Sequence, residues 1–173
     1  MNEIRFEKLV NRHFNFLVTE HGYKINFANR SEYPDLAIED GEAEIVSKRT
    51  SIYIMKSRWD YLFTIRPLGE PEFASMTPLG ILKLFELPVD VLLEKIGSEH
   101  FEEFLSLNAQ IISSQPCKRF VDGDFSHWLD NLDKYIKEFE EDYFRRNNKK
   151  MPEQLFKRLE EYIYVKRMQG HYP

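Results

Sequence analysis

One group of residues in the N-terminal half of the sequence combines side chains that metal-dependent enzymes use. Pro34 and Asp35 precede a segment that contains Glu42, Glu44 and Lys48. In one class of nuclease, an acid and a lysine two positions apart on one strand face flank a metal ion. Here Glu44 and Lys48 are four positions apart, and no Glu-x-Lys triplet occurs in this stretch. The spacing argues against a nuclease and favours charged hairpin residues that face water.

The histidines and the single cysteine do not form the pattern of a metal site. A zinc or di-iron site requires several ligands at fixed spacing, such as two histidines one helical turn apart. No such pair occurs among the five histidines, and Cys117 is the only cysteine. The histidines are His13, His21, His100, His127 and His171. We therefore expect no metal and no cofactor.

Two further positions carry nucleophiles. Ser126 lies close in sequence to Asp124, His127 and Asp130. Catalytic triads, however, are assembled from separate elements, so Ser126 is better interpreted as a helix N-cap. Cys117 precedes Lys118-Arg119, whose charges would lower its pKa and make it reactive, although a lone loop cysteine is more often incidental.

Phosphate-binding and nucleic-acid-binding signals are also missing. The sequence contains no GxGxxG, P-loop or GxSxG motif. Residues 145–150 hold four cations without interleaved aromatic residues, which favours a solvated loop between helices over nucleic-acid binding.

The helices and strands that position these residues can be predicted from two different spacings of apolar residues. Residues 3–21 carry apolar side chains at the three-and-four spacing of an amphipathic helix, and His21-Gly22 predicts its end. The spacing then becomes two, which predicts short strands joined by connections too brief for a parallel crossover. These strands are residues 23–27, 36–38, 43–45, 51–56 and 61–66. Asp40-Gly41 predicts a two-residue hairpin turn in which glycine has a positive φ.

From residue 77 the pattern is helical. Thr77 and Pro78 predict an N-cap and a first turn, Ser98 and Ser126 predict the starts of two longer helices, and Pro152 predicts the first turn of the last helix. The first of the longer helices has an apolar face made of Phe101, Phe104, Leu105, Asn108, Ile111 and Ile112. The second has one made of Trp128, Leu129, Leu132, Tyr135, Ile136, Phe139 and Tyr143.

This order predicts an α+β fold: an N-terminal helix, an antiparallel β-meander of four to five strands, and then four to five helices. Apolar residues make up 42% of the 173 residues, which is enough to bury a core. We expect one domain, residues 1–173, in which the helical part, residues 75–173, packs on the helix and sheet of residues 1–74.

The charge distribution and the cysteine content limit the class of partner and the cellular compartment that we expect. The net charge is −5, and residues 86–103 hold six acids against one lysine. This segment argues against nucleic acid and favours another protein, with a basic surface, as the partner. A single cysteine, no signal-peptide pattern after Met1 and no long apolar window predict a cytoplasmic protein that does not bind or span a membrane.

The segment Phe14 to Lys24, FNFLVTEHGYK, and the hairpin pattern SIYI...DYLFTIRPLG within Glu44 to Leu68 carry a resemblance. They are similar to small bacterial proteins of an immunity-protein-like type, which accompany toxins. The resemblance covers roughly the first 70 residues and depends on apolar spacing. It implies a helix packed on a meander and a binding role, and it identifies no functional residue.

These observations leave three alternatives open: a protein-binding protein, a small enzyme and a structural homodimer. The first is a non-enzymatic protein-binding protein, an immunity-like inhibitor of a bacterial toxin. Its predicted partner-binding residues are Trp59, at the tip of the second hairpin, with Tyr53 and Tyr61 on the adjoining strands. The alternative is a small enzyme whose site is assembled from dispersed residues such as His13, Asp35, Glu44 and Tyr53.

Overall fold

The computed structural model of the chain describes residues 3–28, 41–57, 60–70, 75–85, 87 and 100–168. Its contacts divide the chain into two compact units, Met1–Gly123 and Asp124–Pro173. The expectation of one domain over residues 1–173 stays a prediction.

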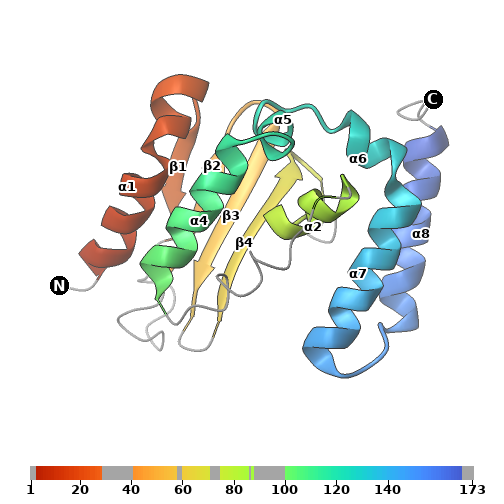
Figure 1. Cartoon of the computed structure of the whole chain (residues 1–173). Helices are drawn as coiled ribbons and strands as arrows, with labels where there is room; N and C mark the ends of the chain where they lie inside the picture. The colour runs from red at the N-terminus through yellow and green to blue at the C-terminus, as the bar shows by residue number, and fades with distance from the viewer. Residues whose placement is uncertain are drawn as a thin grey trace. The chain divides into compact units, whose positions relative to one another are not determined.

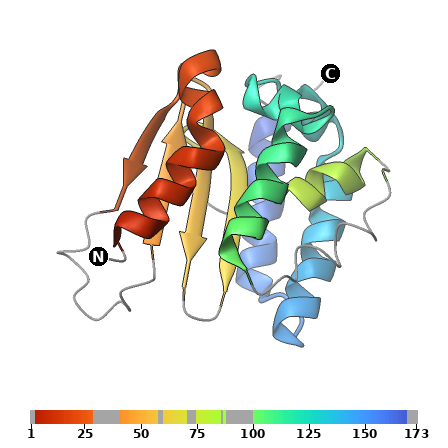
Figure 2. The same ribbon diagram turned by 60° about the vertical axis from the view of Figure 1, so that its left-hand side comes forward.

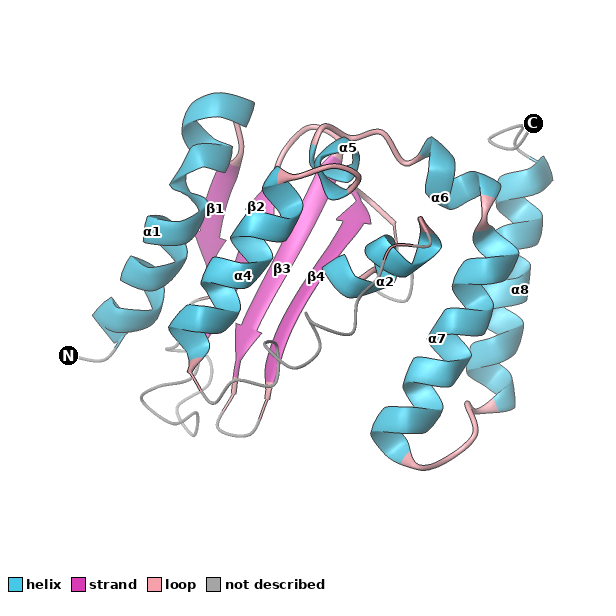
Figure 3. Ribbon diagram, in the orientation of Figure 1, coloured by secondary structure: helices cyan, strands magenta, loops and turns pink. Residues whose placement is uncertain are grey.

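The first unit contains a four-stranded antiparallel sheet in the order β1-β2-β3-β4, which confirms the predicted α+β meander (Figures 1 and 3). The strands are β1 (Lys24–Phe27), β2 (Gly41–Val46), β3 (Thr50–Lys56) and β4 (Tyr61–Pro67). Beyond β4, Met76 forms an isolated antiparallel bridge with Ile65. The expected strand at residues 36–38 lies outside the described residues.

Helices cover one side of this sheet, which we call the first face. Helices α1 (Glu3–His21) and α4 (Phe101–Ser113) lie side by side over it (Figures 1 and 2). Phe14 of α1 packs against Phe63, with ring centroids 5.5 Å apart, and Tyr61 packs against Phe104 at 5.4 Å. The first face consists of Ile25, Phe27, Gly41, Ala43, Ile45, Thr50, Ile52, Ile54, Lys56, Tyr61, Phe63, Ile65 and Pro67. It forms the core of the unit with α1 and α4.

The opposite side of the sheet, the second face, has a different composition. Its residues are Lys24, Asn26, Glu42, Glu44, Val46, Ser51, Tyr53, Met55, Leu62, Thr64 and Arg66. Most of them are half-buried, whereas the isoleucines of the first face on β2, β3 and β4 are fully buried. Within the described part of the first unit, no helix lies over this face (Figure 2).

The structure confirms the predicted end of the first helix and the predicted N-cap at Thr77, but the predicted turn at Gly41 is wrong. Gly22 has φ +69 directly after α1, and Thr77 caps α2 (Pro78–Leu84) by accepting a hydrogen bond from the Gly80 amide. Gly41, in contrast, is not a turn residue with positive φ, because it pairs with Lys56 as the first residue of β2. Asp40 lies outside the described residues. A Cβ at Gly41 would lie 2.5 Å from Cγ of Phe6, so glycine is needed there for space.

A further described helix of the first unit, α5 (Cys117–Val121), follows α4. All six residues of the predicted apolar face of α4 are buried. Its predicted start at Ser98 lies outside the described residues.

The second unit contains α6 (Ser126–Asp130), α7 (Leu132–Asn147) and α8 (Glu153–Met168), and α8 runs in the opposite direction to α7 (Figure 1). One helix was expected from Ser126 onward, but Asn131 interrupts it with φ −120° and ψ 27°. The Asn131 side chain donates to the His127 carbonyl at 2.8 Å, a local bond that competes with the helix. Trp128 is almost fully buried beside Phe125. None of the described helices is long and apolar enough to cross a bilayer.

Candidate functional site

The structure separates the predicted partner-binding residues. Tyr53 pairs with Thr64 on the second face. Tyr61 belongs to the first face, where its ring lies 5.1 Å from that of Phe101. Trp59 lies outside the described residues. Tyr53 and Tyr61 therefore do not share one face, although both flank the same hairpin.

A cluster of polar side chains does form on the second face, around Glu44. Its Oε1 accepts a hydrogen bond from Ser51 Oγ at 2.7 Å and lies 3.4 Å from a guanidinium nitrogen of Arg66. Ser51 is 1% exposed, whereas the side chains of Arg66 and Glu44 are 26% and 41% exposed. Three adjacent strands thus hold one carboxylate in place. Sequence reasoning treated Glu44 as a water-facing hairpin residue and missed the cluster, because strand register brings these residues together.

Apolar side chains border this cluster. Tyr53 pairs with Glu44 across the strands, and Met55 and Leu62 pair with each other one row further along. The second face therefore combines an aromatic ring, a methionine, a leucine and an oriented arginine. Tyrosine, methionine and arginine are enriched at protein interfaces.

The residues of the enzyme alternative do not converge. His13 lies on α1, which covers the first face, while Glu44 and Tyr53 lie on the second face. The sheet separates the histidine from the carboxylate. Asp35 lies outside the described residues. This group therefore has no common site at which a substrate could meet all its described members.

Neither nucleophile has the surroundings that catalysis requires. Cys117 is fully buried, and burial raises the pKa of its thiol to about 12, so the idea that neighbouring cations activate it is wrong. Ser126 Oγ bonds to Asp124 Oδ1 at 2.6 Å, and the serine lies inside the first turn of α6 with Phe125 at the N-cap position. The expected Ser126 cap is therefore wrong, because the Asp124 carboxylate accepts the Ser126 amide hydrogen bond.

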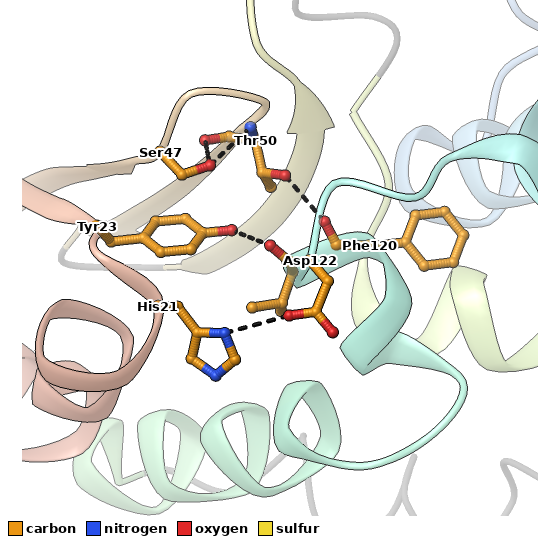
Figure 4. A network of polar contacts seen from close by, with 7 residues as sticks. His21, Tyr23, Ser47, Thr50, Phe120 and Asp122 are labelled. Atoms are coloured by element: carbon orange, nitrogen blue, oxygen red, sulfur yellow. Dashed lines mark hydrogen bonds and ion pairs between the residues drawn. The ribbon is translucent and has the colours of Figure 1, made fainter.

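Several polar residues hold α5 on the end of the sheet (Figure 4). Thr50 Oγ1 donates to the Phe120 carbonyl at 2.9 Å, and Tyr23 donates to the Val121 carbonyl. His21 Nδ1 lies 3.1 Å from a carboxylate oxygen of Asp122. These bonds join segments far apart in the sequence, so local patterns could not reveal them. Their role is to fix the fold.

His13 lies near α4 in an unusual setting. Its Nε2 is buried without a hydrogen-bond partner and lies 3.9 Å from Glu102 Oε1. Burial lowers the pKa of His13, the nearby Arg12 also lowers it, and Glu102 acts in the opposite direction. His13 is therefore mainly neutral at pH 7.

No three His, Cys, Asp or Glu side chains within the described ranges form a group that could hold a metal ion. Of the expected acidic segment, Glu102 and Glu103 are described and exposed. Comparisons with known protein families, with curated proteins and with solved structures gave no match.

Proposed function

We propose that this chain acts by binding another protein through the second face of its sheet, as an immunity-like inhibitor of a bacterial toxin. The observation that carries the proposal is the composition of that face. It holds Tyr53, Met55 and Leu62 beside the Glu44–Arg66 pair, a mixture typical of protein interfaces.

The positions of the reactive residues also support binding over catalysis. His13 is on the other side of the sheet from Glu44 and Tyr53, and the Cys117 thiol is buried. A sheet face with an ion pair, such as Glu44–Arg66, offers complementarity to a protein surface, whereas an enzyme needs groups that converge on a substrate.

Growth protection tests the proposal. Each gene that neighbours the one for this chain is expressed in a susceptible host, with and without the chain. The proposal expects one neighbour to arrest growth and the chain to restore it. If no neighbour is toxic, or if the chain does not protect, the immunity-like function is excluded.

Matched charge reversals then locate the binding surface. Arg66→Glu changes the second face, and Lys8→Glu makes the same change on the exposed side of α1. We expect the first variant to lose protection and the second to retain it. Met55→Asp should also lose protection with little change in melting temperature. A large loss of stability in Met55→Asp would instead assign this face to the chain's own core.

A further inference from the structure

The contact between α1 and α4 contains a group that can change its charge near neutral pH. His13 is a half-buried residue of α1, and its side chain is 17% exposed. The buried Nε2 atom has no hydrogen-bond partner. A buried polar atom without a partner in the protein is uncommon in folded proteins and calls for an explanation.

The carboxylate nearest to this nitrogen already has a partner. Glu102 of α4 accepts a hydrogen bond from Arg12 of α1 at 2.8 Å through Oε1. The same oxygen lies 3.9 Å from His13 Nε2, too far for a hydrogen bond. A protonated His13 would therefore compete with Arg12 for one carboxylate oxygen of α4.

Among the described residues, the strands packed on α1 do not offer a second counter-charge. Strands β1 and β2 present Ile25, Phe27, Gly41, Ala43 and Ile45 toward it. The charged residue of the described first face is Lys56, whose Nζ lies 5.9 Å from the ring centre of Phe101, and Tyr61 lies beside it. The described charges that act on His13 are thus those of Glu102 and Arg12.

We infer that His13 is a proton-sensitive contact between α1 and α4, whose protonation at acidic pH weakens the packing of these helices. The native state disfavours the proton because burial penalises the imidazolium more than Glu102 stabilises it. The unfolded chain therefore binds more protons than the native chain near pH 6. The stability that neutral His13 contributes is present above its unfolded pKa of about 6.5 and decreases as the pH falls through that value.

Histidine-ring NMR over about pH 5 to pH 8 tests the inference in the full chain. We expect the His13 midpoint to lie below the ordinary value. Arg12→Gln should raise the midpoint, because it removes a positive charge and releases Glu102, and Glu102→Gln should lower it. Lys8→Gln removes one positive charge from the same exposed helix side and should leave the midpoint unchanged. A midpoint at or above the ordinary value, or one that neither variant moves, would overturn the inference.

Thermal denaturation gives a second readout. The melting temperature of the wild-type chain should fall more between about pH 7.5 and pH 5.5 than that of His13→Leu, which places an apolar group in the buried site. An equal fall in both proteins would contradict the coupling. The NMR titration uses the wild-type histidine and does not require this variant to fold.

Discussion

Replacement of Gly41 by alanine should destabilise the first unit through a clash with Phe6. The new Cβ would lie 2.5 to 2.9 Å from three ring carbons of Phe6. That ring is 5% exposed and is stacked on Phe101 at 5.5 Å, with Phe27 at its edge at 6.3 Å. Because neighbours hold the ring on two sides, it cannot move away without disturbing the core.

The magnitude follows from two opposing effects. Overpacking of a filled core costs about 1 to 3 kcal/mol. The smaller entropy of the unfolded alanine chain offsets this by about 0.4 to 1 kcal/mol. The difference between the two effects spans about 0 to 2.6 kcal/mol. Because the ring of Phe6 is held on two sides, we expect a net loss of about 1 to 2 kcal/mol, which lowers the melting temperature of a chain of 173 residues by roughly 2 to 8 °C.

Urea denaturation of a double-mutant cycle checks the cause. Phe6→Leu removes the ring, so Gly41→Ala should cost about 1 kcal/mol less in that background than in the wild type. Gly41→Asn distinguishes a need for space beside Phe6 from a need for a positive φ at this position, because asparagine tolerates a positive φ but still carries a Cβ. An unchanged denaturation midpoint in Gly41→Ala, or additive costs in the double variant, would refute the reasoning.

Three further results are expected. Gly123→Ala should lower the free energy of unfolding by about 1 to 2 kcal/mol, because Gly123 has φ +81 and its Cβ would lie 2.6 Å from Cβ of Arg49; calorimetry measures the loss. Thr50→Val should cost about 1 kcal/mol by removing the bond to the Phe120 carbonyl, whereas Thr50→Ser should keep most of that bond, as urea denaturation would show. Cys117 should resist iodoacetamide at pH 8 in the native chain and react in urea, because burial raises the pKa of its thiol to about 12; rapid native labelling, measured by mass spectrometry, would contradict this.

The fold could be predicted in outline because its signals are local. The apolar spacing of α1 and α4 and the alternation of β3 and β4 were sufficient to place these elements. Thr77 was recognised as an N-cap because its hydroxyl serves an amide only three residues away. Such features depend on neighbouring residues, which a sequence displays directly.

Other features depended on distant contacts. Gly41 was assigned to a turn because Asp-Gly favours one, but the ring of Phe6 explains the glycine. The Asn131 interruption arises from a side-chain bond that competes with the helix. The Glu44 cluster required the register of three strands, and the separation of Tyr53 from Tyr61 follows from the same register.

Calorimetric titration tests the proposed binding most directly. It uses paired charge variants of this chain and the gene product that the growth-protection experiment identifies as toxic. The swapped pair Glu44→Arg with Arg66→Glu keeps opposite charges at the two positions, so it should melt near the wild-type temperature. If the toxin contacts the second face, the swapped pair should bind it at least about tenfold more weakly than the wild type, which is a loss of roughly 1.4 kcal/mol of binding free energy. The variant Lys8→Glu should bind the toxin with the wild-type affinity. Equal affinity of the swapped pair and the wild type would contradict binding through this face.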